Sequence, residues 1–334
     1  MPLSGPFKAF LIRQEAGKTV AGFVDMPEGE LDPGEVTIRV AYSSVNYKDA
    51  LAATGTGRII RRFPCVGGID LAGTVVESVD PRFVPGDEVL ATGYDIGVAH
   101  HGGYAEVARL PADWVHRLPV GLGLEEAMAL GTAGFAAALG IMRMEENGLR
   151  PESGPVIVTG ATGGVGSLAI DMLAGRGYRV VALTGKESER DYLLGLGASE
   201  VMPRRPLDPM TIKPLDKALW AGAVDNLGGN ILAWIVSTMK EGGTIASIGL
   251  AASMDLSTTV APFILRGVSL LGVNSAGTVE PRRSQVWQRL AGDLRPRHLA
   301  MMTRTIDFAR LPEIFDDFIQ GRSKGRIVVR IDNQ

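Results

Sequence analysis

Cysteine is nearly absent from this sequence of 334 residues, which contains only Cys65. A single cysteine excludes an internal disulfide and any metal site built from several thiolates, and it is typical of a reducing compartment. Histidine is scarce as well, and the adjacent His100 and His101 have no second cysteine or acid at metal-ligand spacing. We therefore interpret the pair as part of a polar loop and Cys65 as a small buried side chain, and we expect no metal.

Long apolar runs are also lacking. Each is broken by glycine, proline or charge before about 18 residues, so we expect no membrane span. The first residues, MPLSGPFKAFLIRQE, lack the apolar segment and cleavage site of a secretory signal. The formal net charge of -3 gives no reason to expect a nucleic acid or a membrane surface as partner. With 46% hydrophobic and 21% charged residues, the chain is predicted to be a globular protein of the cytoplasm.

The first part of the chain, residues 1–121, has the pattern of a small, mostly β domain. Apolar and polar residues alternate in EVTIRVAYSS and DLAGTVVESV, and Pro-Gly precedes a short strand in FVPGDEVLATG. Pro, Gly and Asp occur so often here that only short helices fit, one of them around Tyr47 to Ala53. We expect this part to form an open barrel.

From residue 122 onward, apolar strands alternate with helices. The segment LEEAMALGTAGFAAALGIMRMEENG is helical in composition, and the strands expected after it are PVIVTG, YRVVALTG, SEVMPR, GAVDNLG, GTIASIG and VSLLGVNS. Such alternation predicts an α/β fold with a doubly wound, parallel, six-stranded sheet over residues 122–275. Residues 276–334 end in a helix and an apolar strand that we expect to return to the first domain.

The segment VIVTGATGGVGSLAI, residues 156–170, joins the first of these strands to a helix through a glycine-rich turn. The dinucleotide fingerprint is G-x-G-x-x-G, and Ala161, Gly163 and Gly166 occupy its three positions, with alanine replacing the first glycine. The helix N-terminus near Val165 would then hold a pyrophosphate. Such a turn alone can be only a turn, but within six alternating strands it predicts a dinucleotide site.

The end of the second strand distinguishes NADP from NAD. An NAD enzyme usually places Asp or Glu about 20 residues after the loop, where it binds the ribose 2′-hydroxyl. This chain has Thr184, Gly185 and Lys186 at that place, and Arg204 at the end of the next strand. A hydroxyl, an amide and two cations suit a 2′-phosphate, which an acid would repel. We therefore predict NADPH, while the glutamates of KESE leave NAD open as the alternative.

The predicted lack of metal limits the chemistry. Without a Lewis acid, alcohol oxidation would need another base and a proton relay. Reduction of a C=C bond conjugated to a carbonyl needs less, because hydride adds to the β-carbon, hydrogen bonds stabilise the enolate oxygen and one acid protonates the α-carbon. The sequence therefore favours metal-free hydride transfer.

Five segments of the sequence carry a family pattern: SSVNYKDALAATG, GIDLAGTVVESVDPRFVPGDEVLATG, GTAGFAAALGIM, VTGATGGVGS and APFILRGVSLLGVNS. Together they resemble the zinc-free quinone-oxidoreductase branch of the medium-chain dehydrogenase/reductase superfamily, and within it the NADPH-dependent acryloyl-CoA reductases. The resemblance implies a GroES-like domain plus a Rossmann domain, and a homodimer paired through the edge strand VSLLGVN. Zinc-dependent relatives have His-Glu where this chain has Ile69 and Asp70.

The resemblance also implies a cofactor site, with Tyr47 of NYKD beside the nicotinamide. Three further groups of residues would form a pyrophosphate loop, a 2′-phosphate turn and the lining of the nicotinamide pocket. In that order they are Thr162, Gly163, Gly164 and Val165; Thr184, Gly185, Lys186 and Arg204; and Leu250, Ile264 and Ser275.

Tyr47 is the candidate proton donor, or the group that holds the thioester oxygen, because a phenol is protonated at neutral pH. The alternative is that Tyr47 only packs on the nicotinamide. Asn46 is a second catalytic candidate, which would bond the cofactor ribose or the substrate, and the alternative for it is a helix cap. Asp49 and Asp70 are interpreted as structural.

Clustered cations in GRIIRRF and GRSKGR would form a basic rim for the phosphates of CoA; they are Arg58, Arg61, Arg62, Arg322, Lys324 and Arg326. Together these features predict an NADPH-dependent reductase that converts acryloyl-CoA to propanoyl-CoA. An NADPH:quinone oxidoreductase and a non-catalytic NADPH-binding member of the superfamily remain the alternatives.

Overall fold

The computed structural model describes residues 5–205, 210 and 212–331, and the chain forms two compact units. Unit 1 comprises residues 1–132 and 303–334, and unit 2 comprises residues 133–302. The domain boundaries expected at 121/122 and 275/276 stay predictions; the compact units divide at 132/133 and 302/303.

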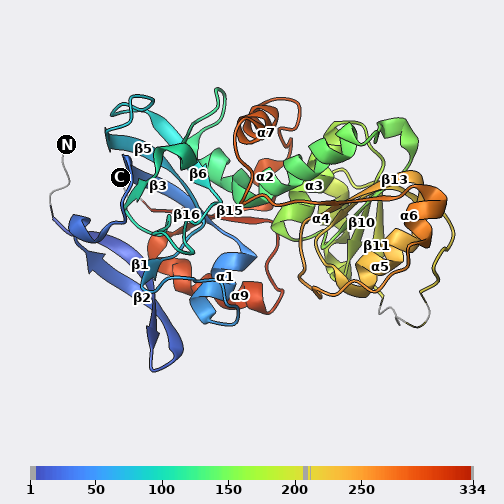
Figure 1. Ribbon diagram of the computed structural model, residues 1–334, viewed down its shortest axis with the longest axis horizontal. Coiled ribbons are helices and arrows are strands. Elements are labelled where there is room, and N and C mark those ends of the chain that lie inside the picture. Colours follow the sequence, from blue (N-terminus) through green and yellow to red (C-terminus); the bar gives the residue numbers. More distant parts are fainter. Residues whose placement is uncertain (1–4, 206–209, 211, 332–334) are drawn as a thin grey trace. The chain divides into compact units, whose positions relative to one another are not determined.

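Unit 1 is mostly β, as predicted, and Figure 1 shows its strands and few short helices. A small sheet has the order β2-β1-β4, and a larger one has the order β15-β16-β3-β5-β6-β8, with β7 paired to β3. The strands are β1 (Phe7–Glu15), β2 (Lys18–Met26), β3 (Val36–Val45), β4 (Cys65–Val66), β5 (Asp70–Ser78), β6 (Glu88–Thr92), β7 (Val107–Leu110), β8 (His116–Arg117), β15 (Thr303–Asp307) and β16 (Arg326–Arg330).

Two sequence predictions about unit 1 are confirmed. The expected short helix is α1 (Tyr47–Thr54), and the last strand, β16, returns to pair antiparallel with β3. The remaining helical segments of unit 1 are short: η1 (Glu28–Glu30), η2 (Ala112–Trp114), η6 (Phe308–Ile314) and α9 (Phe315–Ile319).

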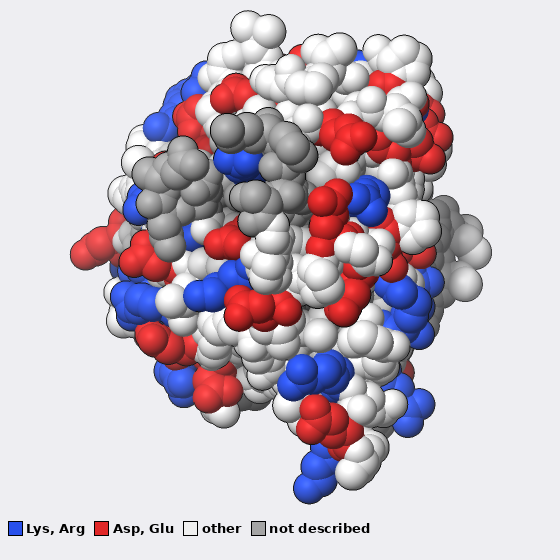
Figure 2. Space-filling view, turned by 90° about the vertical axis from the view of Figure 1, so that its left-hand side faces the viewer, with Lys and Arg blue, Asp and Glu red and all other residues white. Residues whose placement is uncertain are grey.

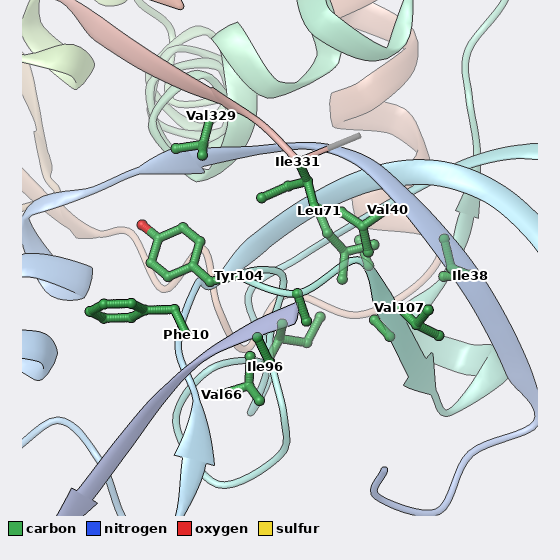
Figure 3. Close-up of a cluster of buried hydrophobic side chains, with 14 of the residues drawn as sticks. Phe10, Ile38, Val40, Val66, Leu71, Ile96, Tyr104, Val107, Val329 and Ile331 are labelled. Carbon is green, nitrogen blue, oxygen red and sulfur yellow. The ribbon is translucent and has the colours of Figure 1, made fainter. Parts of the chain in front are cut away.

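The core of unit 1 is a cluster of buried side chains from both sheets, shown in Figure 3. Alternate residues of β3, including Ile38 and Val40, point into it, as the period of two in a strand requires. Phe10 of β1 meets Tyr104 edge to face, with ring centroids 6.4 Å apart. The strands that carry the polar groups described below are therefore held by a packed apolar layer.

Unit 2 contains the predicted six-stranded sheet, in the order β11-β10-β9-β12-β13-β14, with every pair parallel. The direction of winding reverses between β9 and β12. Ligands of such sheets bind beyond the carboxyl ends of the strands at this reversal. The strands are β9 (Val156–Thr159), β10 (Val180–Thr184), β11 (Glu200–Pro203), β12 (Trp220–Asp225), β13 (Met239–Ser247) and β14 (Ser269–Gly272).

Helical segments lie between β9 and β10, β10 and β11, β12 and β13, and β13 and β14, as crossovers between parallel strands require (Figure 1). Every residue of β9 is buried, which suits a strand covered on both faces. The helical segments of unit 2 are η3 (Pro151–Ser153), α3 (Gly164–Gly175), η4 (Glu187–Glu189), α4 (Arg190–Gly195), α5 (Gly229–Thr238), α6 (Ala261–Arg266), α7 (Arg282–Ala291) and α8 (Leu299–Met302).

The helix α2 (Leu124–Glu146) is interrupted, although its composition is helical throughout. Gly131 has φ 49° and ψ −154°, a conformation that only glycine adopts readily. The interruption frees backbone groups that a continuous helix would pair. The N–H of Thr132 donates to Asp70 at 3.0 Å, and the carbonyls of Met128 and Ala129 accept from Arg326 at 3.3 and 2.8 Å.

Length and composition alone would allow one helix of the described chain, α2, to cross a membrane. The sequence led us to expect no such segment. The helix is nevertheless apolar enough because its mean hydropathy over a window of 18 residues is little affected by single glycines and charges. Buried residues make up 89% of that window, as in the core helix of a soluble protein. Length and apolar composition are therefore weak evidence of a membrane span.

Replacing Gly131 with alanine tests the interruption. A Cβ there would lie 2.6 Å from the Asp70 carboxylate and 2.8 Å from the Arg326 guanidinium, besides the strained backbone. We expect Gly131→Ala to lower the free energy of unfolding by at least about 3 kcal/mol. Gly177→Ala is the control, because Gly177 has φ +85° but nothing within 4 Å of its Cβ position. The control should cost about 1 kcal/mol in urea unfolding, and equal losses would contradict this account.

Candidate active site

The candidate catalytic pair lies at the start of α1 in unit 1. Strand β3 ends at Val45, Asn46 has an extended backbone, and Tyr47 is the first residue of the helix. The N–H of Asn46 donates to Asp49 Oδ2 at 2.8 Å, the return bond of a capping box, which explains why the helix begins here. The Tyr47 side chain is 43% exposed, so its phenol is accessible.

The side-chain amide of Asn46 is held from two sides. Its Nδ2 donates to Asp70 at 2.8 Å and to Asp49 at 3.2 Å, and its Oδ1 accepts from Arg326 Nη1 at 3.1 Å. Both amide hydrogens are thus used inside the protein, and the carbonyl keeps one lone pair. These contacts leave no amide hydrogen of Asn46 for a ligand and favour a structural role for its side chain, so its catalytic role stays a prediction.

Asp70 is a fully buried carboxylate that accepts four hydrogen bonds. Oδ2 accepts from Ser44 Oγ at 2.6 Å, from the Asn46 amide and from the Thr132 N–H, and Oδ1 accepts from Thr132 Oγ1 at 2.5 Å. Arg326, also buried, donates to the same Ser44 Oγ at 2.9 Å. Hydrogen bonds and a nearby cation are what a buried carboxylate needs.

Asp49 is an acid of this cluster with a raised pKa. Burial and, after it, the charge of Asp70 raise its pKa to about 7, although hydrogen bonds from Asn46 and Ile69 oppose the shift. Asp49 Oδ1 accepts from the Ile69 N–H at 3.0 Å, so the acid also fixes the loop before β5. Arg326 therefore faces two acids, and one of them titrates near neutral pH.

In unit 2 the glycine loop has the close approaches that the fingerprint predicts. A Cβ on Gly166 would lie 2.4 Å from the Gly160 carbonyl oxygen, so only glycine lets α3 start this close to β9. Gly163 precedes the helix as its N-cap, with Gly160 O 3.3 Å from its Cβ position. Ala161 is buried at the position of the first glycine. Thr162 and Val165 lie on the same turn and the first helical turn, where unpaired N–H groups favour an anion.

The four residues predicted to bind a 2′-phosphate come together at the carboxyl ends of β10 and β11. Thr184 pairs with Pro203 in the parallel ladder, and the Arg204 N–H donates to the Thr184 carbonyl at 2.6 Å. Thr184 Oγ1 accepts from the Lys186 N–H at 3.0 Å. The Arg204 guanidinium lies against Gly185, 3.2 Å from where a Cβ would be. A side chain at Gly185 would displace that cation.

Sequence reasoning missed a buried acid at the reversal of the sheet. Asp225, the last residue of β12, accepts from Thr159 Oγ1 of β9 at 2.7 Å and from the Gly228 N–H at 2.8 Å. Burial raises the pKa of Asp225. Asn226 adds a bond from Nδ2 to the Thr159 carbonyl at 2.7 Å. An acid directly after an apolar strand, in GAVDN, was the available clue.

The three residues expected to line a nicotinamide pocket lie on separate segments of unit 2. Leu250 follows β13 and is 62% exposed, Ile264 lies on α6 and is 73% exposed, and Ser275 follows β14. The Ser275 carbonyl accepts from the buried Arg283 at 3.0 Å. The structure thus places Leu250 and Ser275 beyond the carboxyl ends of neighbouring strands.

The histidine pair of unit 1 is part of a hydrogen-bonded loop. His101 Nδ1 accepts from the Val66 N–H at 3.0 Å, and burial lowers the pKa of His101. Cys65 is buried, and burial raises the pKa of its thiol to about 12. Across residues 5–205, 210 and 212–331, no group of three or more His, Cys, Asp or Glu side chains could hold a metal ion.

The predicted basic rim is wrong for Arg326, which is 2% exposed and belongs to the buried cluster. Three other cations of the proposed rim are paired with acids: Arg61 with Asp95, Arg62 with Asp32, and Arg322 with Asp317. The face in Figure 2 mixes acidic and basic side chains without one large patch of either sign.

Comparison with known proteins identifies the family of both parts of the chain. Residues 32–120 match the family described as alcohol dehydrogenase GroES-like domain, and residues 164–292 match zinc-binding dehydrogenase. The chain is 45% identical over 319 residues to the acrylyl-CoA reductase AcuI of Ruegeria pomeroyi, covering 96% of this chain and 97% of the relative. It is 47% identical over 325 residues to AcuI of Escherichia coli K12, named as a candidate acrylyl-CoA reductase, covering 97% of this chain and 100% of the relative.

The chain belongs to the medium-chain dehydrogenase/reductase superfamily. As predicted, it is an oxidoreductase of the quinone-oxidoreductase branch, and it is also 46% identical over 330 residues to YhfP of Bacillus subtilis. That relative is named as a candidate quinone oxidoreductase, and the match covers 98% of this chain and 100% of YhfP.

Two solved structures of this superfamily have the same fold. E. coli YhdH with bound NADPH has a TM-score of 0.93 at 47% identity, covering 97% of this chain and 100% of that chain. B. subtilis yhfP with NAD bound has a TM-score of 0.95 at 46% identity, covering 98% and 100%. The predicted GroES-like domain plus Rossmann domain is therefore confirmed for this dehydrogenase/reductase.

The buried acid of this dehydrogenase/reductase predicts a pH dependence of stability. Asp49 has a pKa of about 7 in the folded protein against an ordinary 3.8, so between these values the unfolded chain releases a proton that the folded one keeps. Stability therefore falls as pH rises through this range, by at most about 1.4 kcal/mol per pH unit. Asp49→Asn removes the titration.

Urea unfolding of wild type and Asp49→Asn from about pH 5 to about pH 8 measures this difference. We expect the wild type to lose stability relative to the variant as pH rises, with the difference levelling off above pH 7. Asp307→Asn, at an exposed acid of the same unit, is the control. Parallel curves for wild type and Asp49→Asn would contradict the raised pKa.

Proposed function

We propose that this oxidoreductase reduces the C=C bond of acrylyl-CoA to give propanoyl-CoA, with NADPH as the reductant. The observation that carries the proposal is the whole-length similarity, at 45%, to the acrylyl-CoA reductase of R. pomeroyi. The exposed Tyr47 and the cationic turn of unit 2 supply the side chains that this reaction needs.

The residues of unit 2 fit NADPH. Gly166 allows α3 to begin close to β9, because a Cβ there would lie 2.4 Å from the Gly160 carbonyl oxygen, and Gly185 allows the Arg204 guanidinium to lie against the turn. Thr162, Gly163, Gly164 and Val165 would hold the pyrophosphate at the start of α3, where the helix dipole favours an anion. Arg204 can bond a phosphate through two N–H groups at once, with Thr184, Gly185 and Lys186 beside it.

The same cations support NADPH over NADH. A 2′-phosphate adds two negative charges that Lys186 and Arg204 would balance, whereas a ribose hydroxyl would leave both cations without that partner. E. coli YhdH was solved with NADPH, and B. subtilis yhfP with NAD. The turn of this chain, not the family, therefore decides our choice of NADPH.

NADPH, when bound, supplies the hydride that adds to the β-carbon of the enoyl thioester. Tyr47 would then act in one of two ways: its O–H protonates the α-carbon, or it donates a hydrogen bond to the thioester oxygen as negative charge develops there and a water molecule supplies the proton to the α-carbon. One hydride and one proton balance the two new C–H bonds. Leu250, Ile264 and Ser275 would line the nicotinamide pocket.

The same residues also allow a second function. An NADPH:quinone oxidoreductase is favoured by the 46% identity to YhfP, whose name indicates that activity. A quinone needs no recognition of CoA, and the pairing of Arg61, Arg62 and Arg322 with acids leaves fewer cations for a CoA rim. A non-catalytic NADPH-binding role is disfavoured by the exposed phenol of Tyr47.

We also propose a homodimer paired through the edge strand β14. Apolar side chains are exposed in the segment that precedes this strand, among them Met254, Val260 and Leu265. An uncovered edge with apolar neighbours is an aggregation hazard that pairing with a second copy removes. The molar mass in solution, from light scattering, tests this, and a monomer at micromolar concentration would contradict it.

The buried, protonated thiol of Cys65 suits a cytoplasmic enzyme, where thiols stay reduced. Fractionation of the source cells tests this localisation, and recovery of the enzyme in a secreted fraction would contradict it.

The choice of acceptor tests the reaction. With NADPH, we expect acrylyl-CoA to be reduced at least about a hundredfold faster, as kcat/KM, than free acrylate, because the thioester activates the double bond and CoA contributes binding energy. Loss of nicotinamide absorbance measures both rates, with crotonyl-CoA and a benzoquinone in parallel. If only the quinone were reduced, the result would contradict the reduction of acrylyl-CoA and favour an NADPH:quinone oxidoreductase.

Removing the two cations tests the cofactor. Lys186→Ala/Arg204→Ala should raise the dissociation constant of NADPH about a hundredfold and change that of NADH little. Arg179→Ala/Lys217→Ala is the matched control, because it removes the same charge from residues that precede β10 and β12 at the opposite ends of the strands. Fluorescence titration gives all the constants. If the first variant bound NADPH and NADH more weakly by the same factor, the assignment of this turn to the 2′-phosphate would be contradicted.

A further inference from the structure

We propose that Arg326 and Asp70 are positioning residues for the reaction. They act through Asn46 and set the direction in which the Tyr47 side chain points from the backbone. The inference rests on the proposed role of Tyr47. It differs from the prediction made from the sequence, which placed Arg326 in a surface rim and gave Asp70 only a structural role.

Hydrogen bonds hold the Arg326 side chain in one orientation. Five hydrogen bonds leave its guanidinium: Nε to Ala129 O at 2.8 Å, Nη1 to Val45 O at 3.3 Å and Asn46 Oδ1 at 3.1 Å, and Nη2 to Ser44 Oγ at 2.9 Å and Met128 O at 3.3 Å. A guanidinium has five N–H donors, so all of them are used. The side chain is buried, and no rotation keeps the same set of partners.

Arg326 and Asp70 together define the orientation of the Asn46 amide. The cation donates to Oδ1 and the anion accepts from Nδ2, so a flipped amide would place like groups against each other on both sides. Arg326 also bonds the carbonyl of Val45, the residue before Asn46. The backbone and the side chain at this corner are thus fixed by one cation.

The constraint on Asn46 extends to Tyr47. These residues are consecutive, and the extended backbone of Asn46, with φ −115° and ψ 159°, sets the path by which the chain enters α1. Helix α1 has only eight residues, so little of its own length resists tilting. Fixing Asn46 therefore fixes the Cα–Cβ direction of Tyr47, whereas the exposed phenol is not held by burial.

Arg326→Lys breaks this arrangement while keeping the charge, because an ammonium cannot reproduce the planar fork. We expect kcat with acrylyl-CoA to fall about 10- to 100-fold and the KM for NADPH to stay within about twofold, since displacement of a reacting group by about 1 Å costs this much. Arg109→Lys is the control: Arg109 pairs with Glu28 at 2.8 Å in the same unit, away from Asn46, and its kcat should stay within about twofold.

A double-mutant cycle separates positioning from stability. If Arg326 acts through Tyr47, Arg326→Lys should lower kcat further by less than about twofold in a Tyr47→Phe background, whereas a merely structural role makes the two losses multiply. Multiplied losses, or an unchanged kcat in Arg326→Lys alone, would overturn the proposal.

A readout without turnover separates this proposal from the proposed function. 3-Fluorotyrosine placed at position 47 reports its surroundings by ¹⁹F resonance. We expect that resonance to shift and broaden in Arg326→Lys and to stay unchanged in Arg109→Lys. Should Arg326→Lys not yield folded protein, Asn46→Ser removes the three amide contacts, with Asp70, Asp49 and Arg326, and should give the same change. An unchanged resonance overturns the positioning role, whereas a changed resonance with full activity in Tyr47→Phe overturns only the role of Tyr47.

Discussion

The buried charges of Arg326 and Asp70, which share the partners Ser44 and Asn46, are the constraint on which the catalytic unit depends. Taking two charges out of water is costly, and they are stable here because the broken helix α2 supplies carbonyls to the cation and an N–H to the anion. The break at Gly131, the return of β16 and the start of α1 therefore support one another. If any one of these three features were lost, buried hydrogen-bonding groups of the other two would be left without partners.

The two units contribute different chemistry. Unit 2 provides glycines that allow close approach to a pyrophosphate, and a turn whose cations suit a 2′-phosphate. Unit 1 provides one exposed phenol on a corner held by charges. Many superfamily members share the fold, so the function is argued from these side chains and not from the fold.

Burying a second acid, Asp49, beside Asp70 costs free energy. One cation faces two acids, and burial together with the charge of Asp70 raises the pKa of Asp49 towards neutrality. The fold keeps the acid because its oxygens accept from the N–H groups of Asn46 and Ile69, which hold the start of α1 and the loop before β5. A less polar residue would leave those N–H groups unpaired, at a cost of about 1–3 kcal/mol each.

Local pattern predicted most of the fold. The six strands of unit 2 were found because buried parallel strands appear as short apolar runs between turns, and the glycine loop because its spacing follows from backbone geometry. The cationic turn was predicted from the absence of an acid at the end of β10. These features depend on residues close in sequence.

Long-range pairing could not be predicted. Arg326 lies in GRSKGR, which is typical of a solvated loop, and nothing local shows that Asn46, 280 residues earlier, accepts a hydrogen bond from it. The break in α2 was missed because GTAGF has helical composition, and the groups that bond its freed backbone, Asp70 and Arg326, come from β5 and β16. Asp225 was missed because its partner, Thr159, lies on a different strand.

The central claim is that hydride from NADPH reaches the β-carbon of acrylyl-CoA. Reduction with NADPH that carries deuterium at the transferred position, in ordinary water, followed by NMR of the product, tests it most directly. The account predicts propanoyl-CoA with one deuterium on its methyl carbon and none on the α-carbon. Deuterium at the α-carbon, or oxidation of NADPH without label in propanoyl-CoA, would contradict it.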